Sequence, residues 1–173
     1  MNKHIKTLIL IRHAKSEWGN PFLSDFDRPL NARGKKNALR MGEVLSRRKI
    51  HPDLILSSPA LRAKTTAIEI SDKLSYPADS IRYEPLLYAS EIERIFSVIR
   101  AISKDINTLL VFGHNPEFTE CANALCKCEI DNIPTCGVVA MQLNVDSWEN
   151  IGFNSAKLLF FDTPKQQKDK TLS

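Results

Sequence analysis

The sequence predicts an α/β fold, a three-layer α/β/α sandwich with a mostly parallel central sheet and an antiparallel edge hairpin. Short apolar runs of strand length alternate along most of the chain with segments whose apolar residues recur at helical spacing. The last third then carries two apolar runs, 138–143 and 156–161, with no helical segment between them, and such runs pair antiparallel at a sheet edge. The chain has 173 residues, of which 43% are hydrophobic, so we expect one domain over residues 1–164.

The predicted elements follow from periodicity and from capping residues. We expect the other strands at 5–12, 53–57, 80–84 and 108–112. We expect helices at 32–48, 59–74, 90–103 and 116–125. Asn31, Ser58 and Asn115 are candidate N-caps, because their side-chain oxygens can accept hydrogen bonds from a first helical turn. Pro59 and Pro116 suit the first helical position.

Composition and charge exclude several functional classes. The 24 basic and 20 acidic residues are interspersed and give a net charge of only +4, which is not the footprint of a nucleic-acid-binding protein. No stretch approaches the roughly 18 apolar residues of a membrane helix. The N-terminal apolar run is too short for a signal peptide. We therefore expect a cytoplasmic protein without membrane association, and the polar tail at 165–173 is expected to be disordered.

The four cysteines, Cys121, Cys126, Cys128 and Cys136, lie close together in the sequence. Their spacing does not match the paired Cys-x₂-Cys pattern of a zinc site. In a reducing compartment we expect free and mostly buried thiols, and a disulfide would mean that the cytoplasmic expectation is wrong. The sequence leaves the role of these cysteines open, and it predicts no metal and no cofactor.

Two histidines and two arginines lie at the ends of predicted strands. Arg12 and His13 follow the first strand, His114 follows the strand at 108–112, and Arg62 lies near the start of the helix after the second strand. Open α/β sheets form their ligand crevice at such strand ends. Arginines that stay charged hold oxyanions, and a neutral imidazole is a nucleophile. The set suits phosphoryl transfer through a phosphohistidine intermediate.

Each of these side chains has a role in that hypothesis. Arg12 and Arg62 disfavour protonation of His13 and then stabilise the phosphoryl group once it is attached. Arg62 would be unfavourable at a helix N-terminus unless an anion were bound there. His114 would bind a phosphoryl oxygen or assist the leaving group.

The long polar segment 13–30 holds further candidates, since loops of this length in compact domains are usually functional. Ser16 would either hydrogen-bond a phosphate oxygen or stabilise the turn. Arg28 is either a third cation at the cleft or a loop anchor paired with Asp25 or Asp27. We favour the cleft for Arg28 and a structural role for Asp27.

Three separate motifs resemble the histidine phosphatase superfamily in their order and spacing: Arg12-His13, the segment 57–65, and Gly113-His114-Asn115. The segments 12–18 and 27–34 are similar to the SixA-like phosphohistidine phosphatases. The resemblance covers about residues 8–120. It implies that His13 is the phosphorylated nucleophile, that Arg12, Arg62 and His114 complete a phosphate pocket, and that no metal is needed. A short chain without a lid-forming insertion suits a phosphoryl group presented on a protein surface.

The chain departs from the family pattern at two points. Gly19 stands where an asparagine often follows the tryptophan, and Asn20 comes one place later, so a phosphate contact from Asn20 stays open. Many ester-cleaving relatives carry a glutamate after the third strand. Here Glu84 is the only nearby carboxylate, and Asp25 and Asp27 are the other candidates for a general acid. A phosphohistidine substrate needs a protein acid less than an alkyl phosphate does.

We therefore expect a metal-independent phosphatase of protein phosphohistidine that acts in signal transduction. Its partner would be a phosphorylated protein, such as a histidine-containing phosphotransfer domain, or a small phosphorylated metabolite, and phosphate is the product. Two alternatives stay open: a phosphatase or mutase of small phosphoesters, and a phosphate-binding module without turnover. The sequence names neither the physiological substrate nor the oligomeric state.

Overall fold

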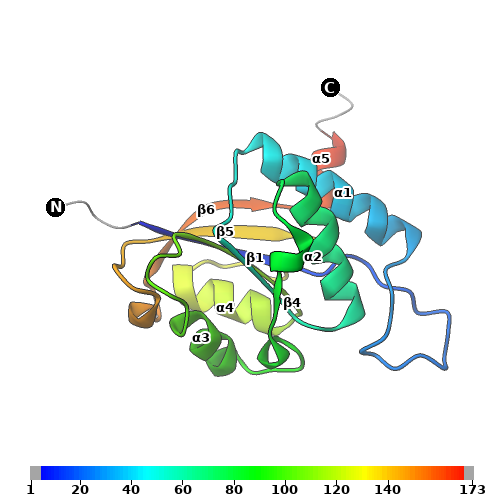
Figure 1. The fold of residues 1–173 in the computed structure, drawn as a ribbon, viewed down its shortest axis with the longest axis horizontal. Helices are drawn as coiled ribbons and strands as arrows, with labels where there is room; N and C mark the ends of the chain where they lie inside the picture. The colour runs from blue at the N-terminus through cyan, green and yellow to red at the C-terminus, as the bar shows by residue number, and fades with distance from the viewer. Residues whose placement is uncertain (1–4, 170–173) are drawn as a thin grey trace.

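The computed structural model describes residues 5–169 as a six-stranded sheet between two layers of helices (Figure 1). The strands are β1 (Lys6–Arg12), β2 (Leu54–Ser57), β3 (Arg82–Tyr83), β4 (Thr108–Gly113), β5 (Val138–Leu143) and β6 (Ala156–Asp162). The helices are α1 (Ala32–Arg47), α2 (Leu61–Lys73), α3 (Ile92–Arg100), α4 (Glu117–Cys126) and α5 (Pro164–Asp169). Short 3-10 turns are η1 (Ala78–Ser80), η2 (Pro85–Leu87) and η3 (Trp148–Asn150).

The strand order across the sheet is β3-β2-β4-β1-β5-β6. The first four of these strands run parallel to one another, whereas β5 is antiparallel to β1 and β6 is antiparallel to β5. This confirms the predicted mostly parallel sheet with an antiparallel hairpin at one edge. The central neighbours β1 and β4 are separated in sequence by two other strands, and a crossover of this kind places a ligand crevice at their carboxyl ends.

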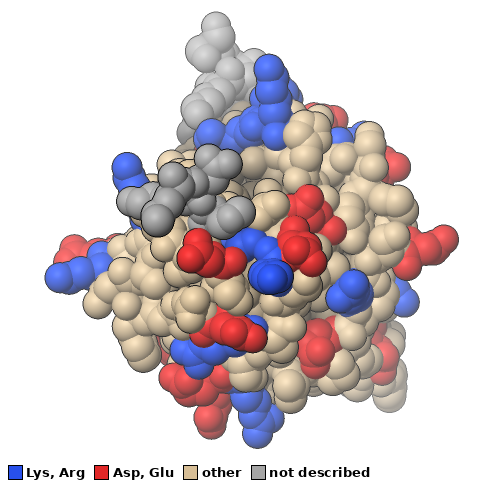
Figure 2. Space-filling view, turned by 60° about the vertical axis from the view of Figure 1, so that its left-hand side comes forward, with Lys and Arg blue, Asp and Glu red and all other residues tan. Residues whose placement is uncertain are grey.

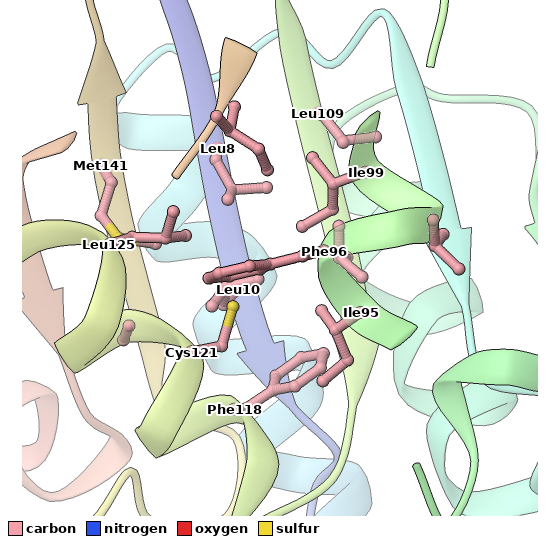
Figure 3. Packing of buried hydrophobic residues seen from close by; sticks show 14 of the residues in the cluster. Leu8, Leu10, Ile95, Phe96, Ile99, Leu109, Phe118, Cys121, Leu125 and Met141 are labelled. Atoms are coloured by element: carbon pink, nitrogen blue, oxygen red, sulfur yellow. The ribbon is translucent and has the colours of Figure 1, made fainter. Parts of the chain in front are cut away.

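Alternate residues of β1 enter two separate cores, one on each face of the sheet. Leu8 and Leu10 pack with α3 and α4, where Phe96 and Phe118 are completely buried (Figure 3). Residues on the other face of β1 pack instead with α1 and α2. The near-continuous apolar sequence of β1 therefore has a physical cause, because a strand covered by helices on both faces has no solvent side.

The helix starts differ in part from the predicted caps. Asn31 caps α1 as expected, since its Oδ1 accepts a hydrogen bond from the Gly34 amide at 2.8 Å. The prediction that Ser58 caps the next helix is wrong: α2 begins at Leu61, and Ser58 Oγ accepts from the Ala60 amide in the preceding turn at 3.3 Å. The prediction that Asn115 caps α4 is also wrong. Its Oδ1 accepts from the Thr119 hydroxyl and not from an amide of the first helical turn.

The prediction of a disordered tail over 165–173 is wrong for residues 165–169, which belong to α5. Thr163 and Gln166 cap the start of this helix reciprocally. The Gln166 side chain accepts from the Thr163 amide at 3.1 Å, and the Thr163 hydroxyl accepts from the Gln166 amide at 3.4 Å. This is a capping box, and Gln167 on the same helix is buried. Residues 170–173 lie outside the described part of the chain.

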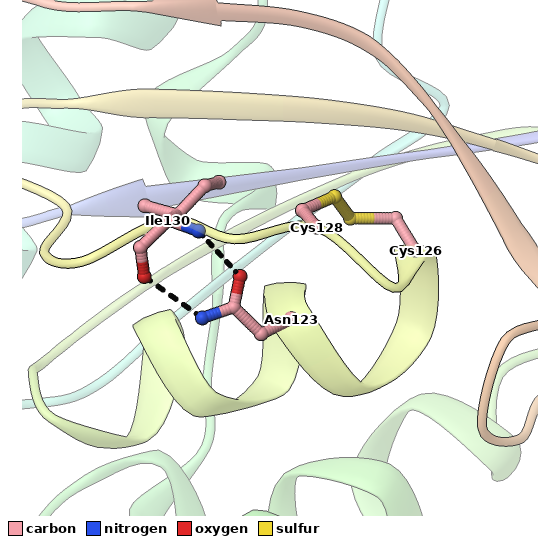
Figure 4. Close-up of a disulfide and its surroundings, with 4 residues drawn as sticks. All are labelled: Asn123, Cys126, Cys128 and Ile130. Atoms are coloured by element: carbon pink, nitrogen blue, oxygen red, sulfur yellow. Dashed lines mark hydrogen bonds between the residues drawn. A yellow bond between two sulfur atoms is a disulfide. The ribbon is translucent and has the colours of Figure 1, made fainter.

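The expectation of four free thiols is wrong for Cys126 and Cys128, which form a disulfide at the end of α4 (Figure 4). Lys127 between them adopts the left-handed conformation, and this turns the chain so that the two side chains meet. Asn123 fixes the same turn by exchanging two hydrogen bonds with the backbone of Ile130, as Figure 4 shows. Disulfides persist mainly in oxidising compartments, so this bond argues against the expected cytoplasmic location.

Cys121 and Cys136 are free and buried. Burial raises the pKa of Cys136 to about 12 and raises that of Cys121 further. These two thiols therefore stay protonated and pack as small apolar side chains.

The surface seen in Figure 2 carries Lys and Arg side chains interspersed with Asp and Glu, without a patch of a single sign. No helix within residues 5–169 is both long and apolar enough to cross a lipid bilayer.

Candidate active site

The register between β1 and β4 brings His13 and His114 together. Arg12 pairs with Gly113 at the ends of the two strands, so the next residue on each strand is a histidine. The His13 amide donates to the Gly113 carbonyl at 3.0 Å, and the two imidazole centroids lie 5.1 Å apart. Gly113 is required here, because a Cβ at this position would lie 2.5 Å from the Phe118 ring.

The hydrogen bonds of His13 define which ring nitrogen is free to react. Nδ1 lies 2.7 Å from the Ala14 carbonyl oxygen, which can only accept, so Nδ1 carries the proton. Nε2 then keeps its lone pair and accepts from Arg62 Nε at 3.3 Å. Burial lowers the pKa of His13 to about 4, aided by the charges of Arg62 and Arg12 and opposed by the bond to Ala14. His13 is therefore neutral at neutral pH.

His114 is held in the opposite tautomer. Its Nδ1 lies 3.4 Å from Arg62 Nη2, and its Nε2 lies 2.8 Å from Ser58 Oγ. Because a guanidinium only donates, Nδ1 accepts and the proton is on Nε2. Burial lowers the pKa of His114 to about 3, and the neighbouring His13 and Arg62 add to the effect. The Tyr88 ring meets His114 edge-on, with the centroids 5.5 Å apart.

Arg62 links both histidines to the long loop. It lies in the first turn of α2 and is 8% exposed. Beyond its contacts with the imidazoles, Nη1 donates to the Asp25 backbone carbonyl at 2.5 Å and Nη2 donates to the Asp25 carboxylate at 2.9 Å. The Tyr88 hydroxyl donates to the same carboxylate oxygen at 3.0 Å. Asp25 therefore fixes the plane of the Arg62 guanidinium.

Arg12 is the second guanidinium of the site. Its Nη1 donates to the Ile133 carbonyl at 2.8 Å, while its Nε is buried and has no partner within residues 5–169. Burial lowers the pKa of Arg12, and the nearby charge of Arg62 lowers it further. A buried unpaired donor carries a desolvation cost, which an oxyanion in the pocket would relieve.

Of these residues, Arg12, His13, Asp25 and Arg62 line a pocket of about 520 Å³. The lining side chains are Arg12, His13, Lys15, Ser16, Trp18, Asp25, Arg33, Arg62, Asn132, Pro134 and Thr135. Four of them are cations and one is a carboxylate, so the pocket attracts anions.

Three of the predicted binding residues have different surroundings. Ser16 is buried in the pocket wall. Arg28 lies outside that wall, with its guanidinium stacked on the Trp18 ring at 3.8 Å and its Nε 4.0 Å from the Asp25 carboxylate. Asn20 is exposed and its Oδ1 accepts from the Phe22 amide at 3.0 Å. The structure thus places Ser16 at the site and Asn20 away from the pocket, while Arg28 contacts two residues of the wall, Trp18 and Asp25.

The three candidate acids also separate. Glu84 accepts from the Leu86 amide at 3.1 Å and lines a different pocket beside α3. Asp27 accepts from the Ser24 hydroxyl at 2.6 Å within the loop. Only Asp25 reaches the pocket. Partial burial opposes its ionisation, but the hydrogen bonds from Arg62 and Tyr88 outweigh this and lower the pKa of Asp25, so it is ionised at neutral pH.

Four residues at the site were not predicted as functional. Ser58 contacts His114, and Tyr88 contacts both His114 and Asp25. Tyr88 lies after β3, where ester-cleaving relatives carry a glutamate, and that position is the signal that points to it. Lys15 and Arg33 belong to the pocket wall, and no spacing in the sequence indicates this. Among residues 5–169, no group of three or more His, Cys, Asp or Glu side chains has the geometry of a metal site.

Comparison with known proteins identifies the family. A profile of the histidine phosphatase superfamily (branch 1) matches residues 8–87. An uncharacterised chloroplastic protein of Arabidopsis thaliana is 32% identical over 152 residues, which are 83% of this chain and 69% of that protein.

Solved structures agree with the sequence match. A SixA of Agrobacterium tumefaciens, assigned as a phosphohistidine phosphatase, superposes with a TM-score of 0.79 at 27% identity, over 92% of this chain and 98% of that one. The protein histidine phosphatase SixA complexed with tungstate has the same fold, with a TM-score of 0.79 at 23% identity and the same coverage of both chains. The chain belongs to the histidine phosphatase superfamily.

Proposed function

We propose that this protein is a metal-independent phosphatase whose nucleophile is His13 and whose substrate is phosphohistidine on a protein. The observation that carries the proposal is the state of His13. Its imidazole is neutral, its Nδ1–H is engaged with the Ala14 carbonyl, and its Nε2 lone pair meets Arg62 in an anion-binding pocket. A neutral, oriented imidazole beside fixed cations suits attack on a phosphoryl group.

In the first step Nε2 of His13 attacks phosphorus, and the bond from phosphorus to the substrate nitrogen breaks. The substrate ring already carries a proton on its other nitrogen, so the bonding electron pair leaves with it as neutral imidazole and no further proton is needed. Arg12 and Arg62 stabilise the equatorial oxygens. His114 contacts Arg62 through Nδ1, while its Nε2–H is engaged with Ser58 Oγ. His13 gains positive charge as the new P–N bond forms, and the Ala14 carbonyl, which accepts from Nδ1 at 2.7 Å, stabilises that charge.

In the second step water attacks the phosphorus of the phosphoenzyme. The P–N bond to His13 breaks, its electron pair returns to Nε2, and the proton lost by water passes to solvent. The same cations hold the phosphoryl oxygens through both displacements. Phosphate and neutral His13 are the products, so the enzyme returns to its starting state.

The environment of Asp25 supports a phosphoramidate substrate over an alkyl ester. An alkoxide leaving group must be protonated by an acid, whereas Asp25 is ionised and already accepts hydrogen bonds from Arg62 and Tyr88. An imidazole ring that already carries a proton on its other nitrogen leaves without such help. A phosphotransfer protein would be a substrate of this class, which would place the enzyme in cytoplasmic signal transduction.

The test is turnover of a phosphohistidine-bearing protein against a panel of phosphoesters, with EDTA present. The variants are His13→Ala and, as a matched control, His51→Ala, which removes an exposed imidazole outside the pocket. We expect loss of phosphate from phosphohistidine, none from esters, and no turnover by His13→Ala. An acid-labile, alkali-stable phosphoenzyme should be trapped with wild type and with His51→Ala, and not with His13→Ala. Residual turnover by His13→Ala would refute the nucleophile, and rapid ester hydrolysis would refute the substrate class.

A further inference from the structure

The pocket carries more positive charge than one phosphoryl group requires. Its wall contains Arg12, Lys15, Arg33 and Arg62 against the single carboxylate of Asp25, and both histidines are neutral at neutral pH. Four cations and one carboxylate give the wall a net charge of +3. A bound phosphoryl group near −2 leaves about one positive charge unbalanced.

The two cations beyond Arg12 and Arg62 are Lys15 and Arg33, and the start of α1 abuts the backbone of Lys15. The Lys15 carbonyl accepts from the Asn31 amide at 3.0 Å. A Cβ at Gly34 would lie 2.1 Å from the same carbonyl oxygen, so a glycine is needed for this approach. The close backbone contact holds the chain at Lys15 against the start of α1, so Lys15 and Arg33 line the same pocket although they are 18 positions apart in the sequence.

Asn31 caps the start of α1, and the charges that follow this cap favour a bound anion. The first turn of α1 contains no acidic residue, and Arg33 adds a cation to the positive end of the helix dipole, which is unfavourable. The amides of Ala32 and Arg33 belong to the first turn of α1, where a helix offers no carbonyl of its own as a partner. Neither Lys15 nor Arg33 forms an ion pair in that part of the chain.

We propose that Lys15 and Arg33 form a second anion subsite, which takes a carboxylate carried by the substrate near its phosphoryl group. The proposal rests on the proposed function for the first subsite, formed by Arg12, Arg62 and the histidines. One carboxylate would balance the single positive charge that remains when the phosphoryl group is bound. It would come from an acidic side chain beside the phosphorylated residue of a protein, or from a small phosphorylated carboxylic acid.

The first experiment measures binding and needs no turnover. Calorimetry would compare phosphonoacetate, which has a phosphonate and a carboxylate, with methylphosphonate, which lacks the carboxylate. We expect wild type to bind phosphonoacetate about tenfold more tightly, as two partly exposed ion pairs allow. The preference should shrink as salt is raised, because exposed charges are screened.

The variant that tests the subsite is Lys15→Gln combined with Arg33→Gln, in which the preference should fall to about one. The matched control is Lys35→Gln combined with Lys36→Gln. It removes the same charge from exposed positions on the same helix that do not line the pocket, and it should keep the preference. Equal binding of both phosphonates by wild type, or a preference that survives in Lys15→Gln/Arg33→Gln, would overturn the subsite.

The second experiment identifies the source of the carboxylate. Two phosphohistidine peptides, identical except for Glu or Gln beside the phosphorylated residue, would be compared by kcat/KM. A preference for the Glu peptide that is lost in Lys15→Gln/Arg33→Gln supports a protein substrate. Equal values together with a clear phosphonoacetate preference support a small phosphorylated acid. Failure of the proposed function is seen separately, as turnover by His13→Ala or as absence of turnover in a wild type that still discriminates between the phosphonates.

Discussion

Acidification should destabilise this fold because two buried imidazoles are kept neutral. The pKa of His13 is lowered to about 4 and that of His114 to about 3, chiefly by burial. In the unfolded chain both groups titrate near 6.5, the usual value for histidine. At a pH below about 6.5 and above the pKa values of the folded state, these two histidines are protonated in the unfolded chain and neutral in the native state. Stability is therefore full above about pH 6.5 and falls as the pH drops towards about 4 for His13 and about 3 for His114.

The size of the effect for His13 follows from its pKa. The difference between about 6.5 and about 4, at about 1.4 kcal/mol for each pH unit, corresponds to about 3 kcal/mol of unfolding free energy. About 2 kcal/mol of this should already be lost at about pH 4.5. That is a large fraction of the stability of a domain of this size.

Urea unfolding at about pH 7 and about pH 4.5 measures the effect. His51→Ala is the matched control, because it removes an exposed imidazole that does not line the pocket. His13→Ala should lose about 2 kcal/mol less than wild type, since it no longer has that imidazole to keep neutral. An equal loss in wild type and His13→Ala would refute the inference that His13 is held neutral in the native state.

Three further predictions concern the pocket and the cores. Arg62→Ala should weaken inhibition by vanadate about 30-fold or more, because charge-assisted hydrogen bonds to an oxyanion are lost; unchanged inhibition would place Arg62 outside the anion site. Gly34→Ala should lower the melting temperature by about 3 °C or more, since its Cβ would lie 2.1 Å from the Lys15 carbonyl oxygen and α1 must shift; an unchanged melting temperature would contradict that packing. Phe96→Ala should lower the free energy of unfolding in urea by about 3–5 kcal/mol, because the side chain is completely buried between helix and sheet. A loss below about 1 kcal/mol would mean that neighbouring side chains fill the cavity.

The sheet and its main helices were predictable because burial leaves a periodic trace in the sequence. β1 is covered on both faces, so its run of apolar residues is continuous, and α3 repeats its apolar residues at helical spacing. The missed helix α5 has no such trace. It is specified by the capping box of Thr163 and Gln166 and by a single buried glutamine.

The centre of the site was predictable because its residues lie at the ends of strands. Register alone places His13 beside His114 once β1 and β4 are neighbours. The surrounding residues depend on contacts that no local pattern encodes. Asp25 is joined to Tyr88, 63 positions away, and Glu84 faces a different pocket because its side chain accepts from the amide of Leu86.

The disulfide was missed for a comparable reason. Two cysteines separated by one residue can pair only when that residue bends the chain sharply, and Lys127 does so in the left-handed conformation. Lysine is not a residue that signals such a bend.

The pairing of Arg12 with Gly113 also limits how this protein can change over evolution. An insertion or deletion of one residue in β1 would exchange the side chains that face α1 and α2 with those that face α3 and α4. The same event would carry His13 away from His114. A change in the length of this strand therefore cannot inactivate the site without also disrupting the fold. Relatives that have lost the activity should have lost it by point substitution, with β1 and β4 at their present length.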